Sequence, residues 1–348
     1  MKLVIFKVNQ LGDNVVFLPV VQELRKRFPD WEIIVATSPA AADLYRGWIQ
    51  DDRLLVHPTS EFNRSWKKPT KFLALATEVR KFKPDACLIP QDQANAAYGL
   101  ALLSGARVRV GAKLPFIKLS FALTHCAQLV PDTKVPLQNW SMVKGLLEEL
   151  APNASWPAVP PPPDLSRLLS SDNDTEKCVV IHPGASRPYQ RWPVDRMAAL
   201  ASRLLDSGVG VIWIDQPQAP APSPQRNLVV RKTPNLSSLV STINSACLFV
   251  GNNSGPMHIA TALGVPSVIP CGPSHINWDP YWHGDRIRLL RHPSLPCLPC
   301  DTLFLARNVC TNATEPMACM NYWTVDRVFE EVQAWKKKWE SSDTRTPL

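Results

Sequence analysis

The chain has 348 residues, a formal net charge of +8 and an isoelectric point near 9.1. This length is too great for one ordinary core and fits two domains of common size. Hydrophobic residues make up 45% and charged residues 20%, which excludes a disordered or fibrous chain. The positive charge favours acidic partners, but no RNA-binding or helix-turn-helix signature accompanies it, so we expect no nucleic-acid partner.

The N-terminal stretch "MKLVIFKVNQLGDN" predicts a strand that runs into a loop. Its apolar run is too short for a signal peptide or a membrane span. We therefore expect a cytoplasmic protein. Its basic surface would suit peripheral contact with the anionic face of the inner membrane.

The first half of the chain alternates between strand-like and helix-like segments. Apolar runs predict strands at 3–8, 31–37 and 86–90, and helical spacing predicts helices at 14–28 and 71–84. This alternation indicates βαβ units and a parallel sheet.

A proline-rich stretch separates the two halves, because clustered prolines cannot extend a helix or a central strand. The expected organisation is a first doubly wound domain over 1–155, a semi-rigid linker over 156–177 and a second doubly wound domain over 178–323. In the second half, strands are predicted at 178–184, 209–215, 247–251 and 265–272, and helices at 194–208, 236–246, 256–264 and 324–339. We expect ligands to bind at the carboxyl ends of the strands, in a cleft between the domains.

Two loops of the second domain, "HPGASRPYQRW" and "GNNSGPMH", place small residues between a strand end and a helix start. Backbone amides in such turns can bind an anion, and arginine can hold a phosphate through two hydrogen bonds, so a diphosphate is the simplest ligand. The alternatives are a capped turn, arginines of a solvated loop and a buried core histidine. The candidate donor-binding residues are Gly184, Ser186, Arg187, Gln190, Arg191, Asn253, Ser254, Gly255 and His258.

Asp215 ends the strand that follows the first of these loops. An acid at this place can accept hydrogen bonds from ribose hydroxyls, although a helix cap or an exposed turn residue explains it equally well. No G-x-G-x-x-G follows a strand and no G-x-x-x-x-G-K-[ST] is present, which argues against nicotinamide dehydrogenases and P-loop enzymes.

In the first domain, Gly12 allows a tight turn and Asp13 stands at the opening of a helix. Asp13 either caps that helix or acts as a general base on a sugar hydroxyl, a role that contributes roughly 10²- to 10⁴-fold in rate. Asn9 and Asn14 flank this turn, and we place Asn9, Gly12 and Asn14 on the acceptor side.

Four cysteines, Cys297, Cys300, Cys310 and Cys319, lie close together within 297–319. They could supply four thiolates to a structural zinc or iron, while reduced thiols or local disulfides are the alternatives. Four protein ligands leave no open position for a substrate, so we expect no catalytic metal here. The acidic "DND" at 172–174 lies in the linker with no strand ahead of it, and we reject it as a catalytic metal site.

The motifs "LGDNVVFLPVVQELRKRFP", "HPGASRPYQRWP", "GNNSGPMHIATALGVPSV" and "CLPC", in this order, resemble glycosyltransferase family 9, the ADP-heptose:lipopolysaccharide heptosyltransferase family. The resemblance implies a GT-B fold of two Rossmann-like domains facing a central cleft. The first domain would bind the acceptor and the second the nucleotide sugar. The terminal segment 324–348 would pack back on the first domain.

The resemblance also implies an inverting transfer that needs no metal. Asp13 matches the acidic base of the family, and Ser254, Gly255 and His258 match its phosphate-binding turn and helix. The chain departs from the family at Gln190, where a lysine is common, and at Asn253, where an acid is common. Losing one charged hydrogen bond of roughly 1.5–3 kcal/mol weakens diphosphate binding about 10- to 150-fold.

The first hypothesis is an inverting transfer of a heptose-like sugar from an ADP-sugar to a lipopolysaccharide or other cell-surface glycolipid or saccharide. The second is a catalytically weakened nucleotide-sugar binding or scaffolding protein of the same fold, which Gln190 and Asn253 motivate. The third is a metal or redox module built on the four cysteines.

Overall fold

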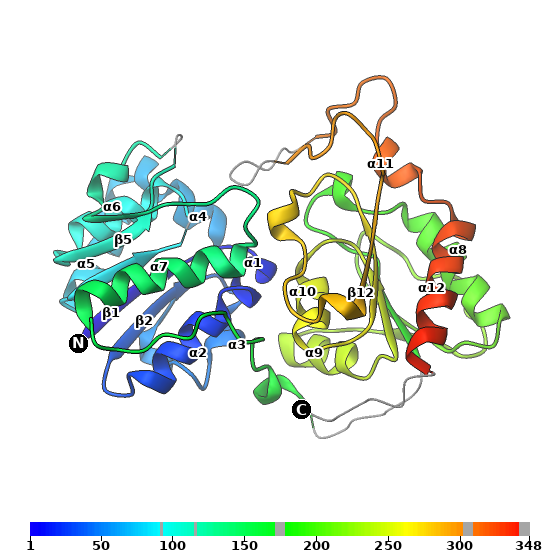
Figure 1. The fold of residues 1–348 in the computed structure, drawn as a ribbon, viewed down its shortest axis with the longest axis horizontal. Coiled ribbons are helices and arrows are strands. Elements are labelled where there is room, and N and C mark those ends of the chain that lie inside the picture. The colour runs from blue at the N-terminus through cyan, green and yellow to red at the C-terminus, as the bar shows by residue number, and fades with distance from the viewer. Residues whose placement is uncertain (91–92, 115–116, 171–177, 302–308, 341–348) are drawn as a thin grey trace. The chain divides into compact units, whose positions relative to one another are not determined.

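The computed structural model describes residues 1–90, 93–114, 117–170, 178–301 and 309–340. The chain divides into two compact units, Met1–Arg167 and Leu168–Leu348. Each unit contains one six-stranded parallel sheet with helices packed on it (Figure 1). The predicted architecture of two doubly wound α/β domains is therefore confirmed. Among the described residues, no helix is both long enough and apolar enough to cross a membrane.

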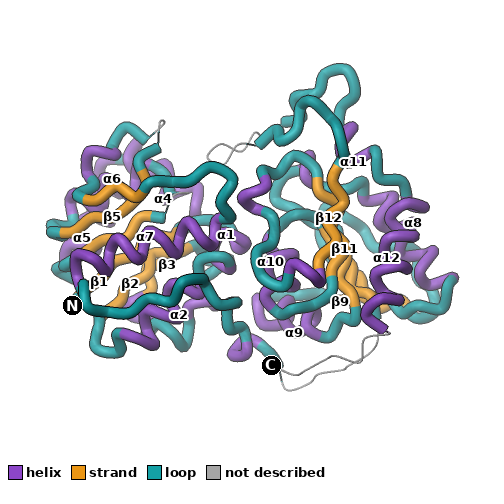
Figure 2. The backbone as a smooth tube through the Cα atoms, viewed as in Figure 1, coloured by secondary structure: helices purple, strands orange, loops and turns teal. Residues whose placement is uncertain are grey.

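The sheet of unit 1 has the order β3-β2-β1-β4-β5-β6. Its strands are β1 (Lys2–Lys7), β2 (Glu32–Thr37), β3 (Leu54–Val56), β4 (Ala86–Ile89), β5 (Val108–Ala112) and β6 (His125–Ala127). Its α-helices are α1 (Leu11–Val15), α2 (Leu18–Arg27), α3 (Ala42–Tyr45), α4 (Thr59–Arg64), α5 (Pro69–Lys81), α6 (Asn95–Leu103) and α7 (Val135–Leu150). Figure 2 separates these helices from the strands by colour.

The segment 14–28, predicted as one helix, is divided between α1 and α2. Pro19 lies in the first turn of α2. Proline has no amide hydrogen and its ring clashes with the preceding turn, so a continuous helix is not possible there. The division leaves α1 as a short turn directly after β1.

Most of the predicted linker is bound to unit 1. The ring centroids of Trp140 and Trp156 are 4.3 Å apart, and Trp140 Nε1 donates to the carbonyl of Pro157 at 2.6 Å. The Gln22 side chain donates to the Asp164 carbonyl at 2.7 Å and accepts from the Asp164 amide at 3.0 Å. The boundary between the units falls at Arg167, and residues 171–177 lie outside the described residues.

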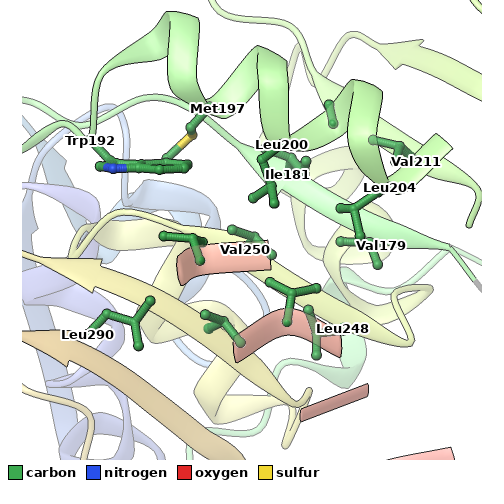
Figure 3. Close-up of a cluster of buried hydrophobic side chains, with 14 of the residues drawn as sticks. Val179, Ile181, Trp192, Met197, Leu200, Leu204, Val211, Leu248, Val250 and Leu290 are labelled. Carbon is green, nitrogen blue, oxygen red and sulfur yellow. The ribbon is translucent and has the colours of Figure 1, made fainter. Parts of the chain in front are cut away.

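The sheet of unit 2 has the order β12-β11-β10-β7-β8-β9. Its strands are β7 (Val179–His182), β8 (Val211–Ile214), β9 (Leu228–Arg231), β10 (Leu248–Gly251), β11 (Ser267–Cys271) and β12 (Ile287–Arg291). Its α-helices are α8 (Val194–Asp206), α9 (Leu236–Asn244), α10 (Gly255–Ala262), α11 (Ala318–Asn321) and α12 (Val325–Glu340). Apolar side chains of β7, β8 and β10 pack beneath α8, where Trp192 lies next to Met197 (Figure 3).

The terminal helix α12 packs within unit 2. Val328 and Val332 of α12 are fully buried in the core cluster of unit 2, and α12 packs against α8 and β11 (Figure 1). Its apolar stripe therefore covers part of the unit 2 core. The packing of the terminal segment 324–348 on the first domain stays a prediction.

Candidate functional site

In unit 1, the candidate site is the turn that joins β1 to α1. Asp13 is half-buried, and its Oδ2 accepts a hydrogen bond from the Gln10 amide at 3.1 Å as part of a capping box. The interpretation of Asp13 as a helix cap is therefore confirmed. A cap uses only some of the lone pairs of a carboxylate, so this contact does not exclude proton transfer by the same group.

Asn14 is fully buried and holds the turn in place. Its Nδ2 donates to the carbonyls of Asn9 and Gln10 at 3.2 and 2.8 Å. Its Oδ1 accepts from the hydroxyls of Tyr45 at 2.7 Å and Thr37 at 3.2 Å. Because four protein contacts occupy this amide, Asn14 supports the turn from below rather than facing an acceptor.

Two further residues of this turn were missed by the sequence analysis. The Gln93 side chain donates to Asn9 Oδ1 at 2.9 Å and accepts from the Val8 amide at 3.2 Å, so it ties the loop after β4 to the turn. Lys7 is fully buried at the end of β1, with its Nζ 5.4 Å from the centre of the Phe17 ring. A lysine inside an otherwise apolar strand was the available signal for the second residue.

In unit 2, Asn252 joins the two predicted phosphate loops. It is fully buried; its Oδ1 accepts from the Trp192 amide at 2.8 Å, and its Nδ2 donates to the carbonyls of Pro183 at 2.9 Å and Gly184 at 3.2 Å. A side chain at Gly184 would place its Cβ 2.9 Å from the ring of His182, so this close approach needs glycine. The sequence analysis named Asn253 but not Asn252.

The N-cap residue of α10 does not cap the helix through its side chain. The Ser254 hydroxyl donates to the Asn252 carbonyl at 3.2 Å and does not cap the helix. The amides of Met257 and His258 bond to the Ser254 carbonyl, while the Gly255 amide has no hydrogen bond within the described residues. Ser254 and Gly255 are half-buried, so this end of the helix can receive an anion.

Burial keeps two histidines of unit 2 neutral at physiological pH. It lowers the pKa of His258 to about 4 and the pKa of His182, at the end of β7, also to about 4. The expectation that His258 is buried is confirmed, since its side chain is 5% exposed. A neutral imidazole at the first turn of α10 offers a hydrogen bond but no charge to a ligand.

Asp301 holds the loop between β7 and α8. Its buried carboxylate accepts from the Tyr189 hydroxyl at 3.1 Å and from Gln190 Nε2 at 3.2 Å, and lies 3.6 Å from Arg187 Nη1. Burial raises the pKa of Tyr189 to about 12, so this phenol remains a donor. Two predicted donor-binding residues thus have a protein partner that the sequence analysis did not identify, although an acid directly after a C-x-x-C pair was visible.

The remaining predicted residues, in this loop and after β8, differ in their surroundings. Arg191 donates from Nε to the Ala185 carbonyl at 2.9 Å and from Nη2 to Gln218 Oε1 at 2.7 Å, so it links the loops after β7 and β8. Ser186 is exposed and Asp215 is half-buried, and the Asp215 carboxylate forms no hydrogen bond or ion pair within the described residues.

A cavity of about 350 Å³ borders these loops. This volume is at the lower end of the range for small-molecule sites. Its lining combines prolines, an aromatic ring and polar ends: Pro183, Pro188, Arg191, Trp192, Pro193, Val194, Gln218, Ala219, Pro316, Met317 and Asn321.

The Asn253 side chain bonds to the end of a neighbouring strand. Its Nδ2 donates to Cys271 Sγ at 3.4 Å, at the end of β11, and its side chain is 7% exposed. Because this amide already has a buried partner, Asn253 serves the turn itself more directly than a ligand.

The four predicted metal ligands are free thiols in the structure. Cys310 Sγ accepts from the Met317 amide at 3.3 Å, and Cys300 Sγ accepts from the Thr311 hydroxyl at 3.7 Å. Burial first, and then the neighbouring thiols, raise the pKa of Cys319 to about 12. Among the described residues, however, no group of three His, Cys, Asp or Glu side chains has an arrangement that could hold a metal ion.

Comparison with known proteins identifies the family of this chain. The model of glycosyltransferase family 9 (heptosyltransferase) matches residues 73–303, which is well over half of the chain. The chain belongs to glycosyltransferase family 9. This family 9 protein is therefore a glycosyltransferase, as its sequence motifs predicted.

Relatives of this family 9 protein cover most of its length. Lipopolysaccharide heptosyltransferase 3 of Escherichia coli is 26% identical in an alignment of length 317 that covers 79% of this chain and 86% of that protein. The structure of E. coli heptosyltransferase WaaC with ADP-2-deoxy-2-fluoro heptose has a TM-score of 0.66 and 16% identity, over 96% of this chain and 99% of that one. The iron-containing dodecameric glycosyltransferase TibC from enterotoxigenic E. coli has a TM-score of 0.57 and 15% identity, over 100% and 78%. These structural matches establish the GT-B fold.

Proposed function

We propose that this family 9 glycosyltransferase moves a heptose-like sugar from an ADP-sugar to a lipopolysaccharide or related cell-surface saccharide, with inversion at the transferred carbon. The observation that carries the proposal is the buried Asn252, which holds the loop after β7 against the turn before α10. A diphosphate placed there would meet the Gly255 amide, the Ser254 region and the guanidinium of Arg187. WaaC, which shares the fold, was solved with an ADP-heptose analogue.

Asp13 is the proposed general base. Its carboxylate is half-buried, and the turn that carries it is held by the saturated amide of Asn14. An acceptor hydroxyl must lose its proton as it attacks the sugar, and a carboxylate in a rigid turn is a suitable group for this. The substitution Asp13→Asn keeps the shape and the cap but removes the proton acceptor.

The experiment combines binding with turnover. Calorimetry with ADP, UDP and GDP should show selective ADP binding that is lost when Ser254→Ala and Arg187→Ala are combined. Asp13→Asn should retain ADP affinity while its turnover with ADP-heptose and a deacylated lipopolysaccharide core falls roughly 10²- to 10⁴-fold. Equal affinity for all three nucleotides would refute the donor assignment, and unchanged turnover of Asp13→Asn would refute the base.

A second candidate function is favoured by one pair of contacts. Gln190 bonds to Asp301 and Asn253 bonds to Cys271, so two positions at which the family commonly has charged residues serve the protein itself. This arrangement fits a weakened nucleotide-sugar binding protein. ADP binding without any turnover would select this function over the first.

We also propose a structural metal at Cys297, Cys300, Cys310 and Cys319. The donors aimed at Cys300 and Cys310 are of the kind that stabilise metal-bound thiolates, and TibC is an iron-containing protein of the same fold. The metal would only hold the 297–319 segment together. Elemental analysis of the purified protein should find about one zinc or iron per chain, and none in a variant with two of the cysteines replaced by serine.

The proposed place of action is the cytoplasmic side of the inner membrane, where a glycolipid acceptor is presented. Peripheral contact with the anionic membrane face belongs to this proposal.

A further inference from the structure

One outer face of unit 1 exposes several large apolar side chains. Trp66 is 53% exposed, Leu73 58% and Phe121 71%, and Leu102 and Leu103 are also exposed. They belong to the short helix η2 (Ser65–Lys67), to α5, to α6 and to the short helix η3 (Ser120–Ala122). Of these segments, α6 contacts the other three, and α5 contacts η2. Apolar side chains gathered on neighbouring segments mark an interaction surface, whereas single ones would need no explanation.

The same face is rich in cations. Within the described residues, none of the following exposed side chains forms a salt bridge: Arg64, Lys67, Lys68, Arg80, Lys81 and Lys83. The last three line one hollow together with Thr77, Pro84, Ser104 and Gly105, and no carboxylate lines it. A hollow of this composition attracts phosphate groups.

Three acids lie in this region. Glu61 Oε2 lies 3.3 Å from Lys71 Nζ, and Asp85 accepts a hydrogen bond from a backbone amide at the start of β1. Glu78 Oε2 lies 3.9 Å from His57 Nε2, but burial lowers the pKa of His57, so this imidazole does not neutralise Glu78. The six cations above and Lys71 outnumber these three acids, so the net charge of this face is positive.

The opposite face of the same sheet has another character. Right-handed crossovers place α5 and α6 on one side of the sheet and α2 on the other, and α7 contacts α2 (Figure 1). On the side of α2 and α7, exposed Lys144 of α7 lies about one helical turn before exposed Glu148 and Glu149. Neighbouring charges of opposite sign are typical of a solvated surface.

We propose that the face formed by η2, α5, α6 and η3, called here the docking face, binds an anionic lipid bilayer. Tryptophan and phenylalanine enter the interfacial layer, and lysines pack their apolar stems there while their ammonium groups reach lipid phosphates. Lys67 Nζ lies 5.5 Å from the centre of the Trp66 ring, which shows such a pair on this surface. A protein partner fits less well, because lysine is depleted in protein interfaces.

The docking face is separate from the candidate donor site. It rests on the proposed function in one respect: an acceptor carried by the membrane would explain why the enzyme binds a bilayer. Each lysine close to an anionic bilayer contributes a modest electrostatic attraction, and several act together with the apolar side chains. The attraction falls as salt increases, because the Debye length shortens.

The test is flotation of the full chain with vesicles of phosphatidylcholine, with and without phosphatidylglycerol. Binding should require phosphatidylglycerol and weaken with salt. Lys67→Glu combined with Lys68→Glu should weaken it about 30-fold or more. Lys26→Glu combined with Lys144→Glu changes net charge equally on the opposite face of the unit and should have a much smaller effect.

A second variant, Trp66→Ser with Leu73→Ser, keeps every charge and should weaken binding about 10-fold. Melting curves and ADP calorimetry on all variants show whether fold and donor site are intact. Equal binding to both kinds of vesicle, no binding to either, or equal losses in the docking-face and control charge variants would overturn the proposal. Vesicle binding without ADP binding would leave docking in place and reject only the donor assignment.

Discussion

Replacing Asp301 is the most direct test of whether the loop between β7 and α8, which carries candidate donor-binding residues, must be held in place. In Asp301→Ala, the Tyr189 hydroxyl loses its acceptor at 3.1 Å, and Gln190 and Arg187 lose theirs at 3.2 and 3.6 Å. Tyr189 is 5% exposed and cannot easily find water, whereas Gln190 and Arg187 are half-exposed and can. An unsatisfied buried donor costs about 1–3 kcal/mol, so we expect unfolding stability to fall by about 2 kcal/mol.

The effect on donor binding follows from the rigidity of this loop. In the variant, ADP binding must immobilise side chains and backbone that Asp301 already holds in place in the wild type. Fixing one residue costs roughly 1–2 kcal/mol, which corresponds to about a 10-fold loss of ADP affinity. Asp301→Asn retains one acceptor oxygen for the Tyr189 hydroxyl, but its NH2 group replaces the oxygen that Gln190 and Arg187 contact. Its loss of ADP affinity should therefore be smaller than that of Asp301→Ala, about 3-fold.

The assays are urea denaturation and ADP calorimetry, with Asp206→Ala as the control. Asp206 is an exposed acid at the end of α8 and should change stability by no more than about 0.5 kcal/mol. If Asp301→Ala kept wild-type stability and ADP affinity, Asp301 would not hold the loop. If Asp301→Asn lost as much affinity as Asp301→Ala, the hydrogen bond to Tyr189 would not be what keeps the loop in place.

Three further predictions concern unit 2. Asn252→Ala should lower unfolding stability in urea by about 2–4 kcal/mol, because three buried backbone groups lose their partner; a loss below about 1 kcal/mol would contradict this. The pKa of His258 is lowered to about 4 in the fold. The unfolded chain therefore takes up the proton first as pH falls below 6.5, and stability should decline by about 1.4 kcal/mol per pH unit towards pH 4. This decline should be shallower in His258→Gln, and parallel curves would argue against it. Gln190→Lys should raise ADP affinity about 10-fold by calorimetry, and an unchanged affinity would show that position 190 does not face the donor.

The strands and most helices of the βαβ units were predictable because their signals are local. Apolar runs gave β1, β7 and β10, and Pro19 explains why one predicted helix is divided. The turn around Asp13 was also predictable as a cap, since a capping box depends on residues three positions apart.

The contacts that hold the candidate site together were not predictable in this way. Asn252 reaches Trp192 across 60 residues, and Asp301 reaches Gln190 across 111. A single sequence carries no periodicity or spacing that pairs positions so far apart. Asn253, with its similar chemistry, therefore looked as good a candidate as Asn252, although it bonds to Cys271 instead.

The sequence by itself determined the two α/β units, the strand-to-helix turns of the candidate site and the family, because hydrophobic alternation and short motifs encode local structure and backbone chemistry. Tertiary structure alone decided that the proline-rich segment lies along unit 1 and that α12 completes unit 2. It also decided which polar side chains remain open to a ligand. The physical reason is that packing assigns each apolar stripe and each buried polar group a partner, and that partner is set by the three-dimensional arrangement of the sheet.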